Sequence, residues 1–130
     1  MADPYRILVT GSREFSDYTT ICLELGAVMK RLIATEGTCP DVIVVHGAAK
    51  GADTLAERAA RAFGMGTEPH PADWDGYGRR AGFIRNAEMV SLGADLALAF
   101  YKQGAGNKGT DHCAKLAEKA GIPTRRITDA

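Results

Sequence analysis

The chain has 130 residues, of which 45% are hydrophobic, and its 16 Lys and Arg residues are balanced by 16 Asp and Glu residues. This length is typical of one domain and argues against two independent cores. The zero formal net charge argues against a protein that coats nucleic acid or anionic lipid, because such proteins need excess Lys and Arg. A local group of cations around one small anion is still allowed.

No stretch of about 18 apolar residues and no signal-peptide pattern occurs in the chain, so we expect a cytoplasmic protein that does not span a membrane. The cysteines are few and widely spaced, which predicts reduced thiols. None of the histidines has a partner at metal-ligand spacing. We therefore expect no metal site and no required cofactor. The residues concerned are Cys22, Cys39, Cys113, His46, His70 and His112.

Short β-rich runs alternate with helical patterns along the whole chain. The first helix is expected to begin at Ser16 or Asp17, since apolar residues then recur at helical spacing from Ile21 to Leu32. Later helices are expected near Gly51 to Phe63, from Arg79 or Arg80 to Leu92, and over 110–120, each followed by a stopping glycine (Gly64, Gly93, Gly121). The expected strands are 6–10, 41–45, 66–70, 95–100 and 124–128.

Strands that alternate with helices predict an α/β fold, a single Rossmann-like doubly wound parallel sheet of about five strands with helices on both faces. The first, second and fourth runs are apolar throughout, as central parallel strands are. The third run contains Pro69 and the fifth contains Arg125 and Arg126, which suit edge positions. These features predict the order 3-2-1-4-5. A ligand would then bind at the carboxyl ends of the strands, where strands 1 and 4 diverge.

Three glycine-rich loops follow the predicted central strands, and each carries a cation and leads to a helix. Glycine allows close approach of backbone N–H groups, and helix N-termini favour anions. Glycine is also common in such turns for purely local reasons, but three cationic loops at one crevice favour a phosphate or pyrophosphate site. The candidate residues in these loops are Gly11, Ser12, Arg13, His46, Gly47, Lys50, Gly51, Asp53, Gly104, Gly106, Lys108, Gly109 and Thr110.

Familiar nucleotide motifs do not fit these loops. The G-x-G-x-x-G match over 104–109 follows the fourth strand, whereas the dinucleotide fingerprint follows the first. The segment 47–51 lacks the spacing and the ending of a P-loop. The sequence therefore predicts neither a dehydrogenase nor a nucleoside triphosphatase.

The segment 71–89 contains the only tryptophan, Trp74, and several arginines. A solvated arginine face and a tryptophan that covers the core would explain this composition. Alternatively, Arg80 or Arg85 would bind a phosphate and Trp74 would contact a base or a sugar.

Taken together, several motifs resemble a known family, over roughly residues 5 to 127. The chain resembles the YspA/cpYpsA-related branch of the SLOG superfamily, which is named after the Smf/DNA-processing proteins and the Lonely Guy phosphoribohydrolases. The resemblance implies one nucleotide-binding domain over residues 1–130. The motifs are Gly11-Ser12-Arg13, His46-Gly47 with Lys50-Gly51-Ala52-Asp53, Trp74, Ala81-Gly82 with Arg85-Asn86 and Met89, and Gly109-Thr110.

The Lonely Guy relatives cleave the N-glycosidic bond of nucleoside monophosphates, which makes such an enzyme the alternative function. By resemblance, Arg85 would hold the phosphate. Two positions depart from the enzymes: Asn86 stands where they have Lys, and Cys113 where they have the catalytic Glu. Glycosidic cleavage requires a carboxylate. The candidates for it are Asp111, Asp53 and Asp75.

The favoured function is that of a sensor or carrier that binds a small nucleotide derivative in the glycine-rich loops. Relatives are usually dimers, so the resemblance also implies a homodimer or a higher homo-oligomer. A DNA-associated protein like the Smf relatives is disfavoured by the neutral charge balance.

Overall fold

The computed structural model describes residues 3–130, so residues 1 and 2 of the predicted domain lie outside the described residues. Its strands are β1 (Tyr5–Gly11), β2 (Val42–His46), β3 (Gly66–Pro69), β4 (Leu96–Tyr101) and β5 (Thr124–Thr128). They form one parallel sheet in the order β3-β2-β1-β4-β5. The predicted fold class and strand order are confirmed.

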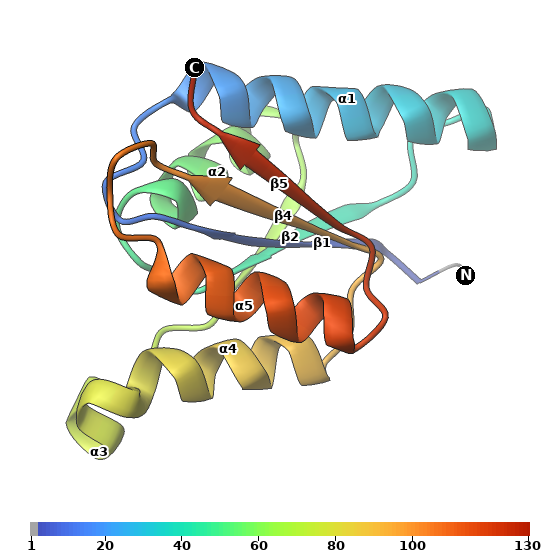
Figure 1. The fold of residues 1–130 in the computed structure, drawn as a ribbon. Helices are drawn as coiled ribbons and strands as arrows, with labels where there is room; N and C mark the ends of the chain where they lie inside the picture. The colour runs from blue at the N-terminus through green and yellow to red at the C-terminus, as the bar shows by residue number, and fades with distance from the viewer. Residues whose placement is uncertain (1–2) are drawn as a thin grey trace.

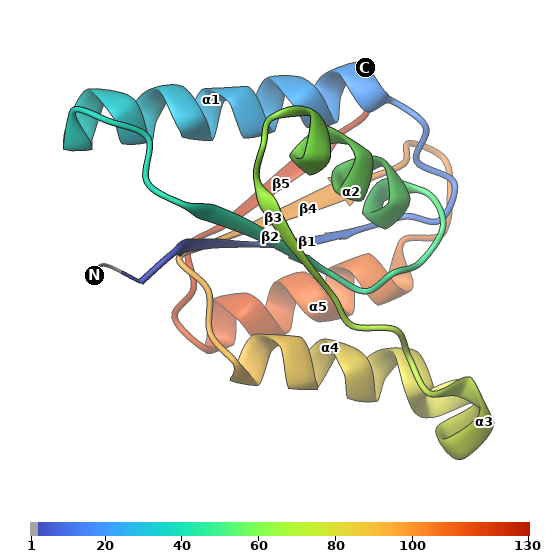
Figure 2. The same cartoon turned by 180° about the vertical axis from the view of Figure 1, so that it is seen from behind.

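The helices cover both faces of the sheet (Figures 1 and 2). One face carries α1 (Tyr18–Glu36) and α2 (Ala52–Ala62), and the other carries α4 (Ala81–Ser91) and α5 (Lys108–Lys119). Because successive strand residues point to opposite faces, β1 supplies both cores. Ile7 and Val9 pack with the first pair of helices, and Leu8 packs with the second.

The helix boundaries follow local chemistry. The Asp17 carboxylate caps α1 by accepting the Thr20 backbone N–H at 3.1 Å. The glycines predicted to stop helices, Gly64, Gly93 and Gly121, all have positive φ. The last helix begins at Lys108 rather than Thr110, because its first turn already forms within the glycine-rich loop. No helix among the described residues has the length and apolar character needed to cross a bilayer.

The segment before α4 differs from the prediction. The third main helix begins at Ala81, one residue after Arg80, and two short helical elements precede it, α3 (Trp74–Tyr77) and η1 (Gly78–Arg80). The Asp73 carboxylate starts α3 by accepting the Gly76 N–H at 2.9 Å. This segment buries no side chain and projects beyond the end of α4 (Figure 1). A segment without an apolar stripe gave no periodic signal, so its helical form was missed.

Candidate functional site

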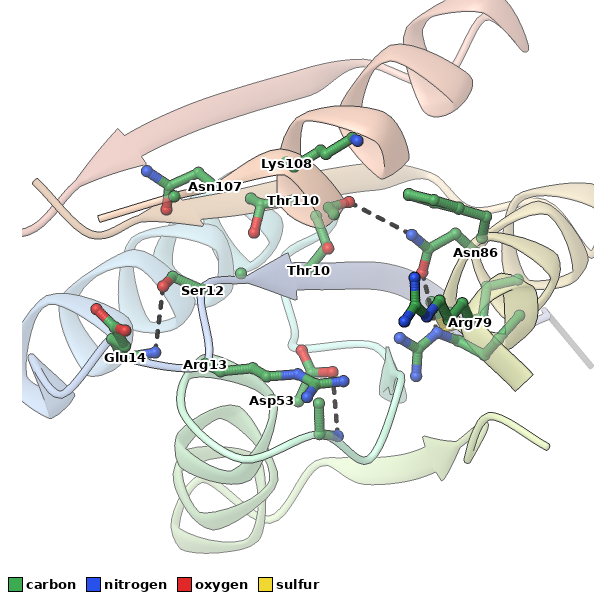
Figure 3. A pocket seen from close by; sticks show the side chains of 18 of the residues that line it. Thr10, Ser12, Arg13, Glu14, Asp53, Arg79, Asn86, Asn107, Lys108 and Thr110 are labelled. Atoms are coloured by element: carbon green, nitrogen blue, oxygen red, sulfur yellow. Dashed lines mark hydrogen bonds between the residues drawn. The ribbon is translucent and has the colours of Figure 1, made fainter. Parts of the chain in front are cut away.

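A cavity of about 420 Å³ opens at the carboxyl ends of β1 and β4, next to the segment that connects β3 to α4 (Figure 3). Its position agrees with the predicted crevice. The cavity walls come from the loops after β1, β2 and β4 and from one side of α4. The lining residues are Thr10, Gly11, Ser12, Arg13, Glu14, Ala49, Asp53, Trp74, Arg79, Gly82, Phe83, Arg85, Asn86, Met89, Gly106, Asn107, Lys108, Gly109 and Thr110.

The structure brings most of the sequence-predicted site residues to this cavity and leaves a smaller group outside its lining. Those that line it are Gly11, Ser12, Arg13, Asp53, Trp74, Arg85, Asn86, Gly106, Lys108, Gly109 and Thr110. Those outside the lining are His46, Gly47, Lys50, Gly51, Arg80, Gly104 and Asp111.

The loop after β2 is built mainly to support the site. His46 is buried, and its ring Nδ1 accepts the Ala48 N–H at 3.0 Å while its Nε2 lies 2.8 Å from Glu57 Oε1. This contact lowers the pKa of Glu57. A Cβ on Gly47 would overlap the guanidinium of Arg85, so a larger residue there would displace the Arg85 side chain. Lys50 is exposed and does not line the cavity.

Arg85 is a structural arginine as well as a lining residue. Its guanidinium donates to the Gly47 carbonyl, to the His70 carbonyl at 3.5 Å and to Asn86 Oδ1 at 2.9 Å. The Asn86 amide in turn donates to the Gly109 carbonyl at 3.4 Å. This chain of hydrogen bonds ties the loops after β2 and β4 to α4. Arg85 thereby fixes the shape of the cavity.

Asp53 is the carboxylate buried most deeply in the wall. It is 5% exposed, and its Oδ2 accepts the Gly47 N–H at 3.0 Å and the Ala49 N–H at 3.4 Å. Its Oδ1 has no hydrogen-bond partner among residues 3–130. Burial raises the pKa of Asp53, while the nearby His46 and Arg85 act in the opposite direction.

The N-terminus of α5 forms the opposite wall. The Asn107 side chain does not cap this helix, because it is bonded instead to the Lys102 N–H and to the Lys102 and Ala105 carbonyls. Within the described chain, the N–H groups of Lys108, Gly109 and Thr110 have no acceptor. Unbonded N–H groups at the start of a helix favour an anion.

Four cationic side chains line the cavity, Arg13, Arg79, Arg85 and Lys108. None of them forms an ion pair with a carboxylate of residues 3–130. The Arg13 guanidinium lies 5.3 Å from the centre of the Trp74 ring, which is a cation–π distance. The cavity therefore has an excess of positive charge in a chain that is neutral overall.

Apolar groups from the α3–α4 segment complete the site. Trp74 and Phe83 contribute aromatic surface, and Met89 is a buried residue of the lining. Gly82, Arg85, Asn86 and Met89 lie at helical spacing i, i+3, i+4 and i+7, so one side of α4 faces the cavity. That spacing was a usable signal for Gly82 and Met89, which the sequence analysis named as family motif residues but not as site candidates.

Other lining residues were missed for different reasons. Thr10, Ala49 and Asn107 lie inside loops already singled out, and Glu14 borders one of them, but nothing distinguished these residues from their neighbours. Arg79 lines the cavity in place of the predicted Arg80. The two arginines lie in a 3₁₀ turn, where consecutive side chains point about 120° apart. The residue at which the helical segment starts decides whether Arg79 or Arg80 faces the cavity, and the sequence did not define that residue.

The carboxylates proposed for bond cleavage are not equivalent. Asp111 lies outside the lining, where it accepts the Tyr101 hydroxyl at 3.1 Å and pairs with Lys115 at 2.8 Å. Asp75 also lies outside the lining. Cys113 is fully buried, and burial raises the pKa of its thiol to about 11. Among the described residues, only Asp53 and Glu14 bring carboxylates to the cavity.

The fold and the cavity together define a Rossmann-like α/β domain with a cationic, partly aromatic site at the carboxyl edge of its sheet. The family model of the YspA, cpYpsA-related SLOG family matches residues 5–77. The chain is also 41% identical over 129 residues to the Gene 61 protein of Mycobacterium phage D29, a match that covers 95% of this chain and 97% of that protein. The chain belongs to the YspA, cpYpsA-related SLOG family, as its motifs predicted. No solved structure matches it significantly.

Proposed function

We propose that the chain binds a nucleotide or a nucleotide derivative, as a sensor or carrier, with a phosphate group at the N-terminus of α5. The observation that carries the proposal is the set of unbonded N–H groups of Lys108, Gly109 and Thr110 in the wall of a cationic cavity. A phosphate would accept hydrogen bonds from these groups and interact favourably with the helix dipole. Lys108 and Arg79 would add charge-assisted hydrogen bonds.

The apolar part of the cavity supports a base as the second recognised group. Trp74 and Phe83 offer flat surfaces on which a base stacks, and both side chains are exposed. A volume of about 420 Å³ lies within the range for small-molecule sites. A homodimer or a higher homo-oligomer, which the family resemblance implies, and a cytoplasmic location remain part of the proposal.

N-glycosidic hydrolysis is the second candidate, and one observation favours it. Asp53 brings a carboxylate with an unpaired oxygen to the same cavity as the cations. Binding is favoured over hydrolysis because the position of the enzymes' catalytic Glu holds Cys113, whose buried thiol does not line the cavity. A hydrolase would have to use Asp53 in its place. Chromatography after incubation with AMP or NAD separates the two candidates, since only a hydrolase releases free base.

Calorimetric titration with AMP, ADP-ribose and adenosine tests the binding proposal. We expect AMP and ADP-ribose to bind and adenosine, which lacks phosphate, to bind at least tenfold more weakly. Lys108→Ala and Arg79→Ala should each weaken AMP binding about tenfold, the effect of one charge-assisted hydrogen bond. Arg31→Ala is the matched control, because Arg31 is an exposed residue of α1 outside the cavity. Equal affinity for adenosine and AMP, or an equal loss in the control, would contradict the proposal.

A further inference from the structure

Asp53 carries a feature that phosphate binding does not use. Its Oδ1 is the one buried side-chain nitrogen or oxygen atom in residues 3–130 that has no hydrogen-bond partner. A buried polar atom without a partner is costly, so folded proteins retain few of them. Asp53 lies in the wall of the cavity, which is where a bound molecule would supply the missing partner.

The surroundings of Asp53 hold the carboxylate in one orientation. The Gly47 and Ala49 N–H groups bind Oδ2, and the residue lies in the first turn of α2, where Ala52 N–H donates to the Ser12 carbonyl at 3.1 Å. The loop after β2 therefore fixes this side chain, and the loop after β1 fixes the start of the helix that carries it.

The charge of the cavity limits the kind of ligand group that could hydrogen-bond Asp53 Oδ1. Arg13, Arg79, Arg85 and Lys108 repel a ligand ammonium group, so a neutral hydrogen-bonding group fits best. Burial raises the pKa of Asp53, because it favours the protonated form over the carboxylate. A hydroxyl suits both forms, because it donates to a carboxylate and accepts from a carboxylic acid.

The position of Asp53 suggests which hydroxyl this is. Asp53 and the Lys108–Thr110 turn lie on opposite sides of the end of β1 (Figure 3). A phosphate at α5 therefore leaves the attached sugar to extend across the cavity toward Asp53. We propose that Asp53 Oδ1 hydrogen-bonds a ribose hydroxyl of the bound nucleotide and makes the cavity selective for ribose over deoxyribose. This inference rests on the proposed function.

The selectivity is measured as a ratio of dissociation constants for AMP, 2′-deoxy-AMP and 3′-deoxy-AMP. The wild-type chain should bind AMP about tenfold more tightly than at least one of the deoxy analogues, the effect of one hydrogen bond to a buried carboxylate. The analogue that loses affinity identifies the hydroxyl. In Asp53→Ala, AMP should bind as weakly as that analogue. Asp53→Asn keeps an oxygen for the Gly47 and Ala49 N–H groups and places a neutral amide NH₂ where Oδ1 was. The hydrogen bond to the hydroxyl is then no longer charge-assisted, so the ratio should fall below about three.

Asp41→Asn is the matched control, because Asp41 is exposed at the opposite end of the sheet and should leave the ratio unchanged. If Asp53→Ala fails to fold, the ratio of dissociation constants in the wild-type chain and in Asp53→Asn still tests the inference. Equal binding of AMP and both analogues by the wild-type chain overturns the inference but leaves the proposed function standing. A ratio that persists in both Asp53 variants also overturns it. If none of the nucleotides binds, both proposals fall.

Discussion

At the scale of single residues, the distribution of buried polar side chains is informative. Most of the core is apolar, and the buried polar or charged residues are Thr10, Ser12, His46, Asp53, Asn86 and Thr110. All of these except His46 line the cavity, and His46 supports the loop that holds Asp53. Burial of polar groups is unfavourable unless they are satisfied. Their concentration at one place supports the proposal that the cavity is the binding site.

Glu68, on the edge strand β3, allows a test of the electrostatics away from the site. Its carboxylate accepts two hydrogen bonds from Arg6, both at 2.9 Å, and lies 2.7 Å from His70 Nε2. These contacts lower the pKa of Glu68 from 4.5 to about 2. A carboxylate whose pKa is lower in the folded chain stabilises the fold above the unfolded pKa. That contribution is lost as the pH falls from about 4.5 to about 2.

Glu68→Gln should therefore lower the free energy of unfolding by about 1 kcal/mol at pH 7, since about a third of the side chain is exposed. The difference from wild type should shrink as the pH falls through this window. Urea unfolding at a series of pH values measures both quantities. Glu36→Gln, at the exposed end of α1, is the control and should have little effect. A Glu68→Gln difference that stays constant down to pH 2 would contradict the assignment.

At the scale of elements, the apolar runs predicted the central strands, and Pro69 and the arginines of β5 predicted the edges. These signals worked because a central parallel strand is buried on both faces, which restricts its composition. The positions of the glycine-rich loops followed from the strand order. The individual contacts did not follow, because Gly47 and Arg85 meet only in the folded chain, 38 residues apart. The α3 and η1 turns bury no side chain, so the fold required no apolar pattern there from which they could have been predicted.

Two glycine-to-alanine substitutions test the packing of these elements. In Gly26→Ala, the new Cβ would lie 3.6 Å from Phe63 Cζ, an ordinary contact, so α1 should gain about 0.5–1 kcal/mol from reduced backbone freedom. In Gly11→Ala, the Cβ would lie 2.3 Å from Ala52 Cβ, so the substitution should cost about 1–3 kcal/mol. Chemical denaturation measures both. A Gly11→Ala variant as stable as wild type would show that β1 and α2 are not in close contact, and a destabilised Gly26→Ala variant would contradict the packing described for α1.

At the scale of the whole molecule, overall neutrality conceals local polarity. The equal counts of acidic and basic residues argue against a general affinity for nucleic acid, yet four cations without carboxylate partners within residues 3–130 line one cavity. Many of the other cations are paired on the surface, as Arg6 is with Glu68 and Arg126 with Glu118. The fold supports this arrangement because the carboxyl ends of all five parallel strands meet at one edge.

The most direct test of nucleotide binding at this edge is a set of ¹H–¹⁵N NMR spectra recorded during titration with AMP. The largest shifts should occur at the backbone amides of Lys108, Gly109 and Thr110, since the phosphate would accept their hydrogen bonds, and smaller shifts should occur at Ser12. The amide of Asp41, at the opposite end of the sheet, should not shift. Unchanged amides at the start of α5 with saturating AMP, or shifts confined to the opposite edge, would contradict the account.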